Sequence, residues 1–365
     1  MRLTAEAAPR SLARSPSLGR AALVLGIGLT ICLAVLVLAV AVGSVGVSPG
    51  ETARILAHRL LGIPLPVTWP PSSETIIFEL RLPRVLAAML VGAGLASAGT
   101  VFQALLRNPM ADPYLIGTAA GASLGAIGGI VLPMLLPGLA IGAGAAWLGI
   151  GAVQLLAFGG GLLTVLLVYA VARSSGSVPV VTLLLTGYAV SSILAAAVAL
   201  LMVLSGRALA AVFAWLMGSL AAASWSDLAF AAPLVGISIG LLMLRWRRLN
   251  LLLLGEAGAA HLGVEVEREK LILTALATLA TSAVVAISGT IGFVGLVVPH
   301  LLRLAIGPDH RLLLPASALF GAALLALADL GARLAGGIPV GIVTALIGAP
   351  FFLWLLRRSR TRLMP

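Results

Sequence analysis

The sequence predicts an all-α polytopic membrane protein with about ten transmembrane helices, and composition and patterning together support this prediction. Of 365 residues, 61% are hydrophobic and only 10% are charged, whereas about 25% are charged in an ordinary soluble domain. Mean hydropathy is +1.15, and charge-free runs reach the roughly 20 residues that a helix needs to cross a bilayer. Strands of an outer-membrane barrel alternate polar and apolar residues, so a barrel is not expected.

The same composition excludes several classes of function. A soluble enzyme of this size would need more surface charge, and the single cysteine, Cys32, cannot form a disulfide scaffold. A net charge of +11 would suggest nucleic-acid binding in a soluble domain, but here the arginines lie between apolar runs, as is typical of membrane topology. A lipid bilayer is therefore the expected surrounding, and nucleic acid is not an expected partner.

The chain is expected to begin with a cytoplasmic tail. Residues 1–20 are polar and contain four arginines and two prolines. The charge-free run at 21–42 is too long for the apolar region of a cleaved signal peptide, so it is interpreted as an uncleaved first span. Residues 44–80 are polar and rich in proline, with a short helix expected near 51–61.

Nine further spans are expected between residues 85 and 356. Residues 113–172 carry no charge and are long enough for two crossings, with a break near 133–142. Residues 271–302 are short for two crossings, and Gly289, Gly292 and Gly295 are expected to make the turn between a seventh span and a short eighth. The other spans are expected at 85–106, 182–204, 228–244, 312–328 and 334–356. All belong to one transmembrane domain at 21–358, and residues 359–365 form a second cytoplasmic tail.

The distribution of positive charge supports this order of crossings. With the N-terminus inside and ten spans, 17 of the 23 basic residues lie on the inner side, in agreement with the positive-inside rule. Both termini are then cytoplasmic. The outer arginines include Arg81, Arg84 and Arg333, and they need a separate explanation.

Chemistry that the sequence lacks is also informative. A nucleotide-binding P-loop needs a lysine after a glycine-rich loop, but the only lysine, Lys270, follows Glu269 without such a loop. If transport uses ATP, another polypeptide must hydrolyse it. No cluster of His, Cys and carboxylate has the spacing of a metal site. Asp329 is the best acidic candidate inside a span, with Arg333 four residues later, and it keeps an ion-coupled secondary transporter as the alternative function.

Six short segments stand out along the chain. They are RLPR at 81–84, RNPMADP at 107–113, LGEAGAAHLGV at 254–264, SGTIGFVGLVVPHLLR at 288–303, GPDHRLLLP at 307–315 and PVGIVTALIGAPFF at 339–352. In this order and spacing they resemble the FecCD-type permeases, the membrane subunits of binding-protein-dependent ABC importers for iron–siderophore complexes, haem and cobalamin. The resemblance covers about residues 20–358.

The resemblance implies a type II ABC importer permease fold, with ten helices per subunit and one path between the two copies of a homodimer. It also implies two ATP-binding cassette subunits that bind ATP and magnesium, and a periplasmic or lipid-anchored substrate-binding protein. This chain itself would be no enzyme and would bind no cofactor. The expected location is a bacterial inner membrane. The expected cargo is an iron chelate (siderophore or haem) or cobalamin, with iron favoured because such systems are common.

Residues 250–267 form the most charged segment and lie on the predicted inner side. Gly255 and Gly263 break the segment, and small apolar residues between them suit a pair of short helices that insert into a groove on another protein. The resemblance implies that this loop receives the motion of the ATPase, through Leu254, Gly255, Glu256, Ala259, Leu262 and Gly263. Related permeases carry a basic residue where this chain has Ala260. The alternative is an ordinary amphipathic loop at the membrane surface.

The resemblance gives the outer arginines Arg81, Arg84 and Arg333 a role in docking the binding protein through its glutamates. A bidentate pair of arginine and carboxylate suits a contact that must release. Two alternatives remain open: the side chains extend to lipid phosphate, or they pair with Glu79 and Asp329.

The resemblance also places a cytoplasmic gate at the end of the second span and in the loop between the fourth and fifth spans. Asn108 and Met110 match the first position, and Ser175 and Ser177 approximately match the second. A plain turn is the alternative for the second position. The path itself is expected to run along the fifth and tenth helices, with small or apolar residues facing inward: Ala189, Ser192, Thr344 and Gly348.

Overall fold

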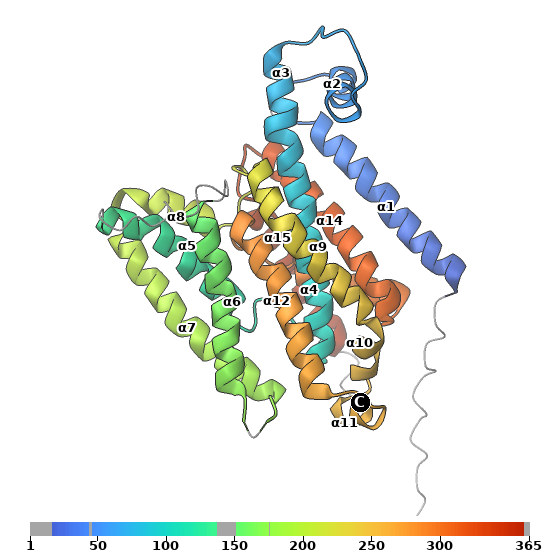
Figure 1. Cartoon of the computed structure of the whole chain (residues 1–365), viewed down its shortest axis with the longest axis vertical. Coiled ribbons are helices and arrows are strands. Elements are labelled where there is room, and N and C mark those ends of the chain that lie inside the picture. Colours follow the sequence, from blue (N-terminus) through green and yellow to red (C-terminus); the bar gives the residue numbers. More distant parts are fainter. Residues whose placement is uncertain (1–16, 44–45, 137–150, 175, 361–365) are drawn as a thin grey trace, which may run out of the picture.

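The computed structural model describes residues 17–43, 46–136, 151–174 and 176–360, and these residues are predominantly helical (Figure 1). The first half contains α1 (Leu18–Ala41), α2 (Pro49–Leu61), α3 (Pro71–Thr75), the π-helical turn η1 (Ile76–Arg81), α4 (Leu82–Leu105), α5 (Thr118–Leu135), α6 (Ala152–Ala172) and α7 (Val180–Leu204). The second half contains η3 (Gly206–Ala208), α8 (Leu209–Leu216), α9 (Trp225–Leu244), α10 (Trp246–Leu252), α11 (Glu256–His261), α12 (Val266–Ser288), α13 (Val294–Ile306), α14 (His310–Leu334) and α15 (Val340–Arg360).

The expected all-helical membrane fold is confirmed. Within the described residues, eight helices are long and apolar enough to cross a membrane. They are α1, the continuous helix formed by α3, η1 and α4, and α5, α6, α7, α9, α12 and α14. The expected eighth and tenth spans correspond to α13 and α15, which contribute the shorter apolar stretches Val294–Ile306 and Val340–Trp354.

The second span differs from the prediction at its N-terminal end. Residues 71–81, expected as part of a polar stretch, are helical and continue directly into α4. Pro71 lies in the first turn of α3, where a missing N–H does no harm. Before Pro83 the helix widens into η1, in which the N–H of Leu82 bonds to the carbonyl of Ile77 five residues back.

The predicted turn between the seventh and eighth spans is confirmed, with one correction. Gly289 ends α12 with a φ of 67°, a left-handed value that glycine adopts without strain. Gly292 follows in the connection, but Gly295 lies inside α13. A Cβ on Gly295 would meet the carbonyl of Leu95 and the ring of Pro113, so this glycine permits close helix packing rather than a turn.

The ends of the predicted domain fall partly outside the described residues. Of the N-terminal tail, residues 1–16 are not described, and α1 already begins at Leu18 because the Ser17 hydroxyl accepts the N–H of Arg20. Residues 137–150, which contain part of the predicted break between the third and fourth spans, and residues 361–365 of the C-terminal tail also lie outside the described part.

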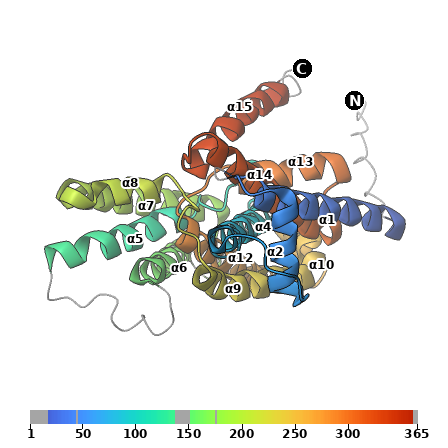
Figure 2. The same cartoon turned by 90° about the horizontal axis from the view of Figure 1, so that it is seen from above.

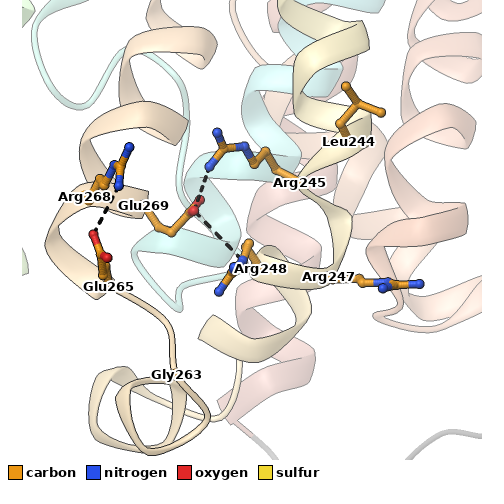
Figure 3. A pocket seen from close by; sticks show the side chains of 8 residues that line it. All are labelled: Leu244, Arg245, Arg247, Arg248, Gly263, Glu265, Arg268 and Glu269. Atoms are coloured by element: carbon orange, nitrogen blue, oxygen red, sulfur yellow. Dashed lines mark hydrogen bonds and ion pairs between the residues drawn. The ribbon is translucent and has the colours of Figure 1, made fainter.

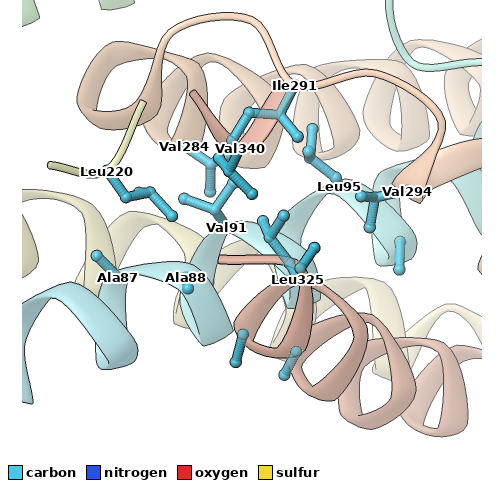
Figure 4. Close-up of a cluster of buried hydrophobic side chains, with 14 of the residues drawn as sticks. Ala87, Ala88, Val91, Leu95, Leu220, Val284, Ile291, Val294, Leu325 and Val340 are labelled. Atoms are coloured by element: carbon cyan, nitrogen blue, oxygen red, sulfur yellow. The ribbon is translucent and has the colours of Figure 1, made fainter. Parts of the chain in front are cut away.

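Helix α4 is the centre of the larger of two helix groups. It packs against α14, α12, α13, α9 and α1, and Val91, Leu95, Val284 and Leu325 meet in its core (Figure 4). Glycine makes the close approach possible, because a Cβ on Gly92 would collide with the backbone carbonyl of Gly321 on α14.

The smaller group contains α5, α6, α7 and α8, which lie together to one side of the α4 bundle (Figures 1 and 2). Helix α12 joins the groups because it contacts both α4 and α6. Figure 2 also shows α15 extending away from the bundle. The short helices mark opposite ends of the molecule: α2 and α3 lie at one end, whereas α10, α11 and the α6–α7 connection lie at the other (Figure 1).

Candidate functional site

A buried ion-pair cluster lies at the end of the molecule that carries α2 and α3. Arg84 donates from Nε and Nη2 to the carboxylate of Asp329 over distances of 2.9 to 3.1 Å. The Nε of Arg333 lies 3.2 Å from the other side of the same carboxylate. The Asp329 side chain is only 1% exposed. The cluster therefore ties the start of α4 to the last turns of α14.

Two of the predicted docking arginines also hold the C-terminal end of α1. The last carbonyls of a helix have no partner within the helix. Arg81 donates to the carbonyls of Val40 and Ala41, each at 3.2 Å. Arg333 donates to Ala39 at 2.8 Å and to Val42 at 3.3 Å. Arginine side chains from two other helices thus satisfy the end of α1.

The structure brings all three predicted docking arginines together. It shows the pairing alternative for Arg84 and Arg333 through Asp329, whereas Glu79 is exposed. Two of the three guanidinium groups, those of Arg84 and Arg333, share the carboxylate of Asp329. Docking of a binding protein through Arg81, Arg84 and Arg333 stays a prediction.

The predicted coupling segment forms a hairpin of α10 and α11 at the opposite end, which we call the coupling hairpin. Gly255 separates α10 from α11 with φ 93° and ψ 162°, a region that is essentially restricted to glycine. Leu254 and Leu262 flank α11 and are 54% and 58% exposed. Ala259, on the other side of α11, is fully buried against the bundle. Of the residues predicted for coupling, the two leucines are exposed and Ala259 anchors the hairpin.

The hairpin also has an ionic anchor that sequence reasoning missed. Lys270, in the second turn of α12, lies 3.1 Å from Glu256 of α11 and 2.7 Å from Glu267. The same ammonium donates to the backbone carbonyl of Val178, in the connection before α7, at 2.8 Å. The only signal in the sequence was an isolated lysine among acidic residues, three residues after Glu267.

A basic cavity of about 440 Å³ opens beside the hairpin (Figure 3). Arg245 donates to Glu269 at 2.6 Å, and the Nε of Arg248 lies 4.0 Å from the same carboxylate oxygen. Glu265 and Arg268 form a second pair across 3.4 Å. The contact between Arg245 and Glu269 joins the end of α9 to the start of α12, so the hairpin between these helices is anchored at its base.

The two predicted gate segments are turns, and residues that flank them, Leu106 at the end of α4 and Val178 before α7, line the same small cavity. Asn108 accepts the backbone N–H of Met110 at 2.9 Å, closing the turn after α4. Ser177 exchanges two backbone hydrogen bonds with Ser174 at 2.9 and 3.0 Å. Ser175 lies outside the described residues. Among the hydrogen bonds of the described residues, none joins the Asn108 turn to the Ser177 turn.

The turn after α4 continues into a half-buried aspartate. The Oδ1 of Asp112 accepts the N–H of Tyr114 at 2.9 Å, and burial raises the pKa of Asp112 to about 6. Tyr114 donates from its hydroxyl to the carbonyl of Ile291 at 3.1 Å. Burial, followed by the nearby charge of Asp112, raises the pKa of Tyr114. This loop is therefore tied to the connection between α12 and α13.

Only half of the expected path-lining residues lie on an open face. Ala189 and Ser192 are exposed on α7. Thr344 and Gly348 are buried within the chain instead. Because Gly348 has no side chain, the ring of Phe293, which precedes α13, lies directly against the α15 backbone.

Comparison with known proteins places these features in context. Residues 31–358 match the FecCD transport family. A cobalamin import system permease protein of Halobacterium salinarum is 46% identical over 300 residues, which are 82% of this chain and 78% of the relative. A hemin transport system permease protein of Yersinia pestis is 44% identical over 291 residues, covering 78% of this chain and 84% of the relative. A solved metal-chelate type ABC transporter in an inward-facing conformation is similar at a TM-score of 0.77 and 32% identity, over 92% of this chain and 99% of the other.

Proposed function

Because this chain belongs to the FecCD transport family, we propose that it is the transmembrane permease subunit of a binding-protein-dependent ABC importer in a bacterial inner membrane. Two copies enclose one path. Two ABC subunits hydrolyse ATP at the cytoplasmic face, and a periplasmic or lipid-anchored binding protein delivers the cargo at the other face. Both termini are cytoplasmic in this proposal, and α10 and α11 form the cytoplasmic end of the described residues.

The proposed cargo is a metal chelate: an iron–siderophore complex, haem or cobalamin. Relatives named for cobalamin and for hemin match this chain at 46% and 44% identity, so the similarity supports the class and not one member. The exposed positions Ala189 and Ser192 on α7 are small. A wall of this kind lets a bulky ligand pass without holding it, and specificity then resides in the binding protein.

The observation that carries the proposal is the coupling hairpin. Leu254 and Leu262 present apolar side chains at the end of the molecule, on a short helix whose inner side is buried through Ala259. An exposed apolar ridge on an anchored base is suited to a groove on another protein. In an importer the partner at this end is the ATPase, and the ridge transmits its motion.

The alternative, an ion-coupled secondary transporter, depends on Asp329. A coupling carboxylate must take up and release a cation as the protein changes state. Asp329 is 1% exposed and lies between the guanidinium groups of Arg84 and Arg333. These permanent charges already neutralise the carboxylate, so the geometry favours a structural role.

The first test is assembly with the ATPase. Leu254→Asp places a charge on the proposed ridge, and we expect co-purification of the ATPase with the tagged permease to fall about tenfold, as for loss of an interface anchor. Leu60→Asp is the matched control, because Leu60 is also 54% exposed but lies in α2 at the opposite end. This control variant should retain the ATPase and should support uptake of chelate into cells.

Two results would contradict the importer. One is a wild-type chain that binds no ATPase but moves solute along an ion gradient in liposomes. The other is full retention of the ATPase by Leu254→Asp, because the exposed ridge would then make no contact with the partner that an importer needs at this end.

A further inference from the structure

Lys270 is the only lysine of the chain, and it lies at the meeting point of three segments. It comes from the start of α12, and its side chain is only 9% exposed. Its ammonium contacts Glu267 of α12, Glu256 of α11 and the carbonyl of Val178, over 2.7, 3.1 and 2.8 Å. An ammonium has three N–H donors, and each of them has an acceptor here.

The backbone of Val178 is held from both sides. Lys270 binds its carbonyl, and the second oxygen of Glu267 accepts its N–H at 3.0 Å. The next residue, Pro179, has no N–H and caps α7. The Lys270–Glu267 pair, which we call the Val178 clamp, therefore grips the last backbone N–H before α7 begins.

Apolar packing surrounds the clamp and strengthens it. Val178, just before α7, and Leu183, in its first turn, belong to the same buried cluster as Ala259 of α11 and Leu273 of α12. Hydrogen bonds to charged groups are stronger in such low-dielectric surroundings, and their loss costs more.

Elsewhere, α7 depends on a different part of the molecule. It packs against α5 and α6 in the smaller helix group, whereas α11 belongs to the end of the α4 bundle (Figure 1). The clamp is thus a direct polar link between the coupling hairpin and a helix of the smaller group. Glu256 is 44% exposed, so a partner at the hairpin can reach it, whereas Lys270 is shielded.

We propose that Lys270, held by Glu267, is a positioning residue that makes the coupling hairpin and the start of α7 move as one body. This inference rests on the proposed function, since it assigns to the clamp the transfer of ATPase motion to a helix of the transport path. Displacement of α11 pulls Lys270 through Glu256, and Lys270 carries the backbone of Val178 with it.

The test uses the complete complex with its ATPase and binding protein in proteoliposomes. Lys270→Met keeps a chain of similar length but removes the charge and the donors. We expect this variant to assemble and hydrolyse ATP, while chelate uptake per ATP falls about tenfold, within the usual range of a coupling free energy. Arg268→Met is the matched control: its ion pair with Glu265 is exposed and makes no contact with the clamp, so coupling should be unchanged.

A second measurement follows the clamp in the chain that keeps Lys270, so its main result does not depend on how the Lys270→Met variant folds. Spin labels at Ala257 on α11 and Val181 on α7 are introduced as cysteines in a Cys32→Ser background. In the wild-type clamp, their distance should stay constant between nucleotide-free and nucleotide-trapped complexes. In Lys270→Met the distance distribution should broaden.

A wild-type distance that changes with nucleotide would overturn the inference, as would normal coupling in Lys270→Met. These outcomes are separable from failure of the proposed function, in which no ATPase binds to the wild-type chain. In that case, the width of the distance distribution in the isolated chain, with and without Lys270, still decides whether the clamp holds α11 to α7.

Discussion

Asp329 balances two arginines from different helices, and one of them also holds the end of α1. Asp329→Asn removes this charge and leaves Arg84 and Arg333 without a counter-ion. Breaking a buried pair by removing one partner costs about 3 to 5 kcal/mol. Because Arg84 is partly exposed, we expect a loss near 3 kcal/mol, seen as a lower midpoint when the solubilised protein is heated and its tryptophan fluorescence is followed.

Glu79→Gln is the control, because Glu79 is an exposed carboxylate on the same side of the molecule. Its midpoint should equal that of the wild type. A stable Asp329→Asn protein that retains its ATPase but has lost transport would contradict the structural role and return attention to ion coupling at this residue.

The raised pKa of Asp112 predicts that the folded protein loses stability as pH rises. Its pKa is raised to about 6 in the folded protein, against about 4 in an unfolded chain. Between these values the folded state binds more protons, so stability falls as pH rises from about 4 to about 6. Asp112→Asn can still accept the N–H of Tyr114 but cannot ionise. Relative to the wild type, it should gain stability with rising pH, by up to about 3 kcal/mol at pH 7.

The measurement compares unfolding midpoints of the two proteins at pH 5 and pH 7.5. Other titrating groups act in both proteins, so only the difference between them reports on Asp112. Glu265→Gln, which removes an exposed carboxylate, should follow the wild type at both pH values. An Asn variant that loses stability relative to the wild type as pH rises would show the sign to be wrong.

At the scale of single residues, the local sequence pattern was enough to predict the boundaries of the coupling hairpin. The glycines at 255 and 263 marked the breaks of the hairpin, and both have positive φ. The Val178 clamp could not be predicted, because Lys270 and Val178 are 92 positions apart. A contact of that range depends on how α6, α7 and α12 pack, and periodicity within one segment does not contain this information.

At the scale of helices, charge-free length was a sufficient signal for the spans, but their boundaries depended on finer chemistry. The polar, Pro-rich composition of 44–80 favoured a loop. Yet Pro71 suits the first turn of a helix, and the wider π-helical turn η1 accommodates Pro83. The helix therefore extends through 71–105. Helix α8 was not predicted, because eight residues make too short a run to stand out in an apolar sequence.

Glycine spacing predicted that helices would approach closely but not which ones would meet. Gly92 and Gly99 lie seven residues apart on α4, about two helical turns. A Cβ on Gly92 would collide with Gly321 on α14, and one on Gly99 with Gly295 on α13. Both partners lie about 200 positions away, so the pairing appears only in the folded structure.

At the scale of the whole molecule, the two candidate surfaces lie at opposite ends. The arginine cluster lies beside α2 and α3, and the coupling hairpin lies beyond the far end of α4 (Figure 1). Helices α4, α12 and α14 run between the two ends and form a tightly packed bundle. This separation suits a transporter that receives cargo at one face and energy at the other.

Helix α7 has a widely exposed face, on which the side chains of Tyr188 and Val203 are 75% and 82% exposed. A homodimer would turn part of α7 toward a wet central path, whereas the outer face of α1 would stay in lipid. We therefore predict that Ala189→Cys, in a Cys32→Ser background, reacts in membranes with a charged, water-soluble thiol reagent. Val37→Cys on the exposed face of α1 should not react, because a charged reagent does not enter the hydrocarbon region.

A bifunctional thiol reagent applied to the same two variants also tests the number of copies. In a symmetric pair the two Ala189→Cys positions face the same path, so a bifunctional reagent should join them into a covalent dimer, and Val37→Cys should stay monomeric. If Ala189→Cys reacts as little as Val37→Cys, α7 faces lipid as α1 does. The path would then have to lie within one chain, and the cavity of about 340 Å³ lined by Val153, Trp215 and Ser288 would become the place to search for it.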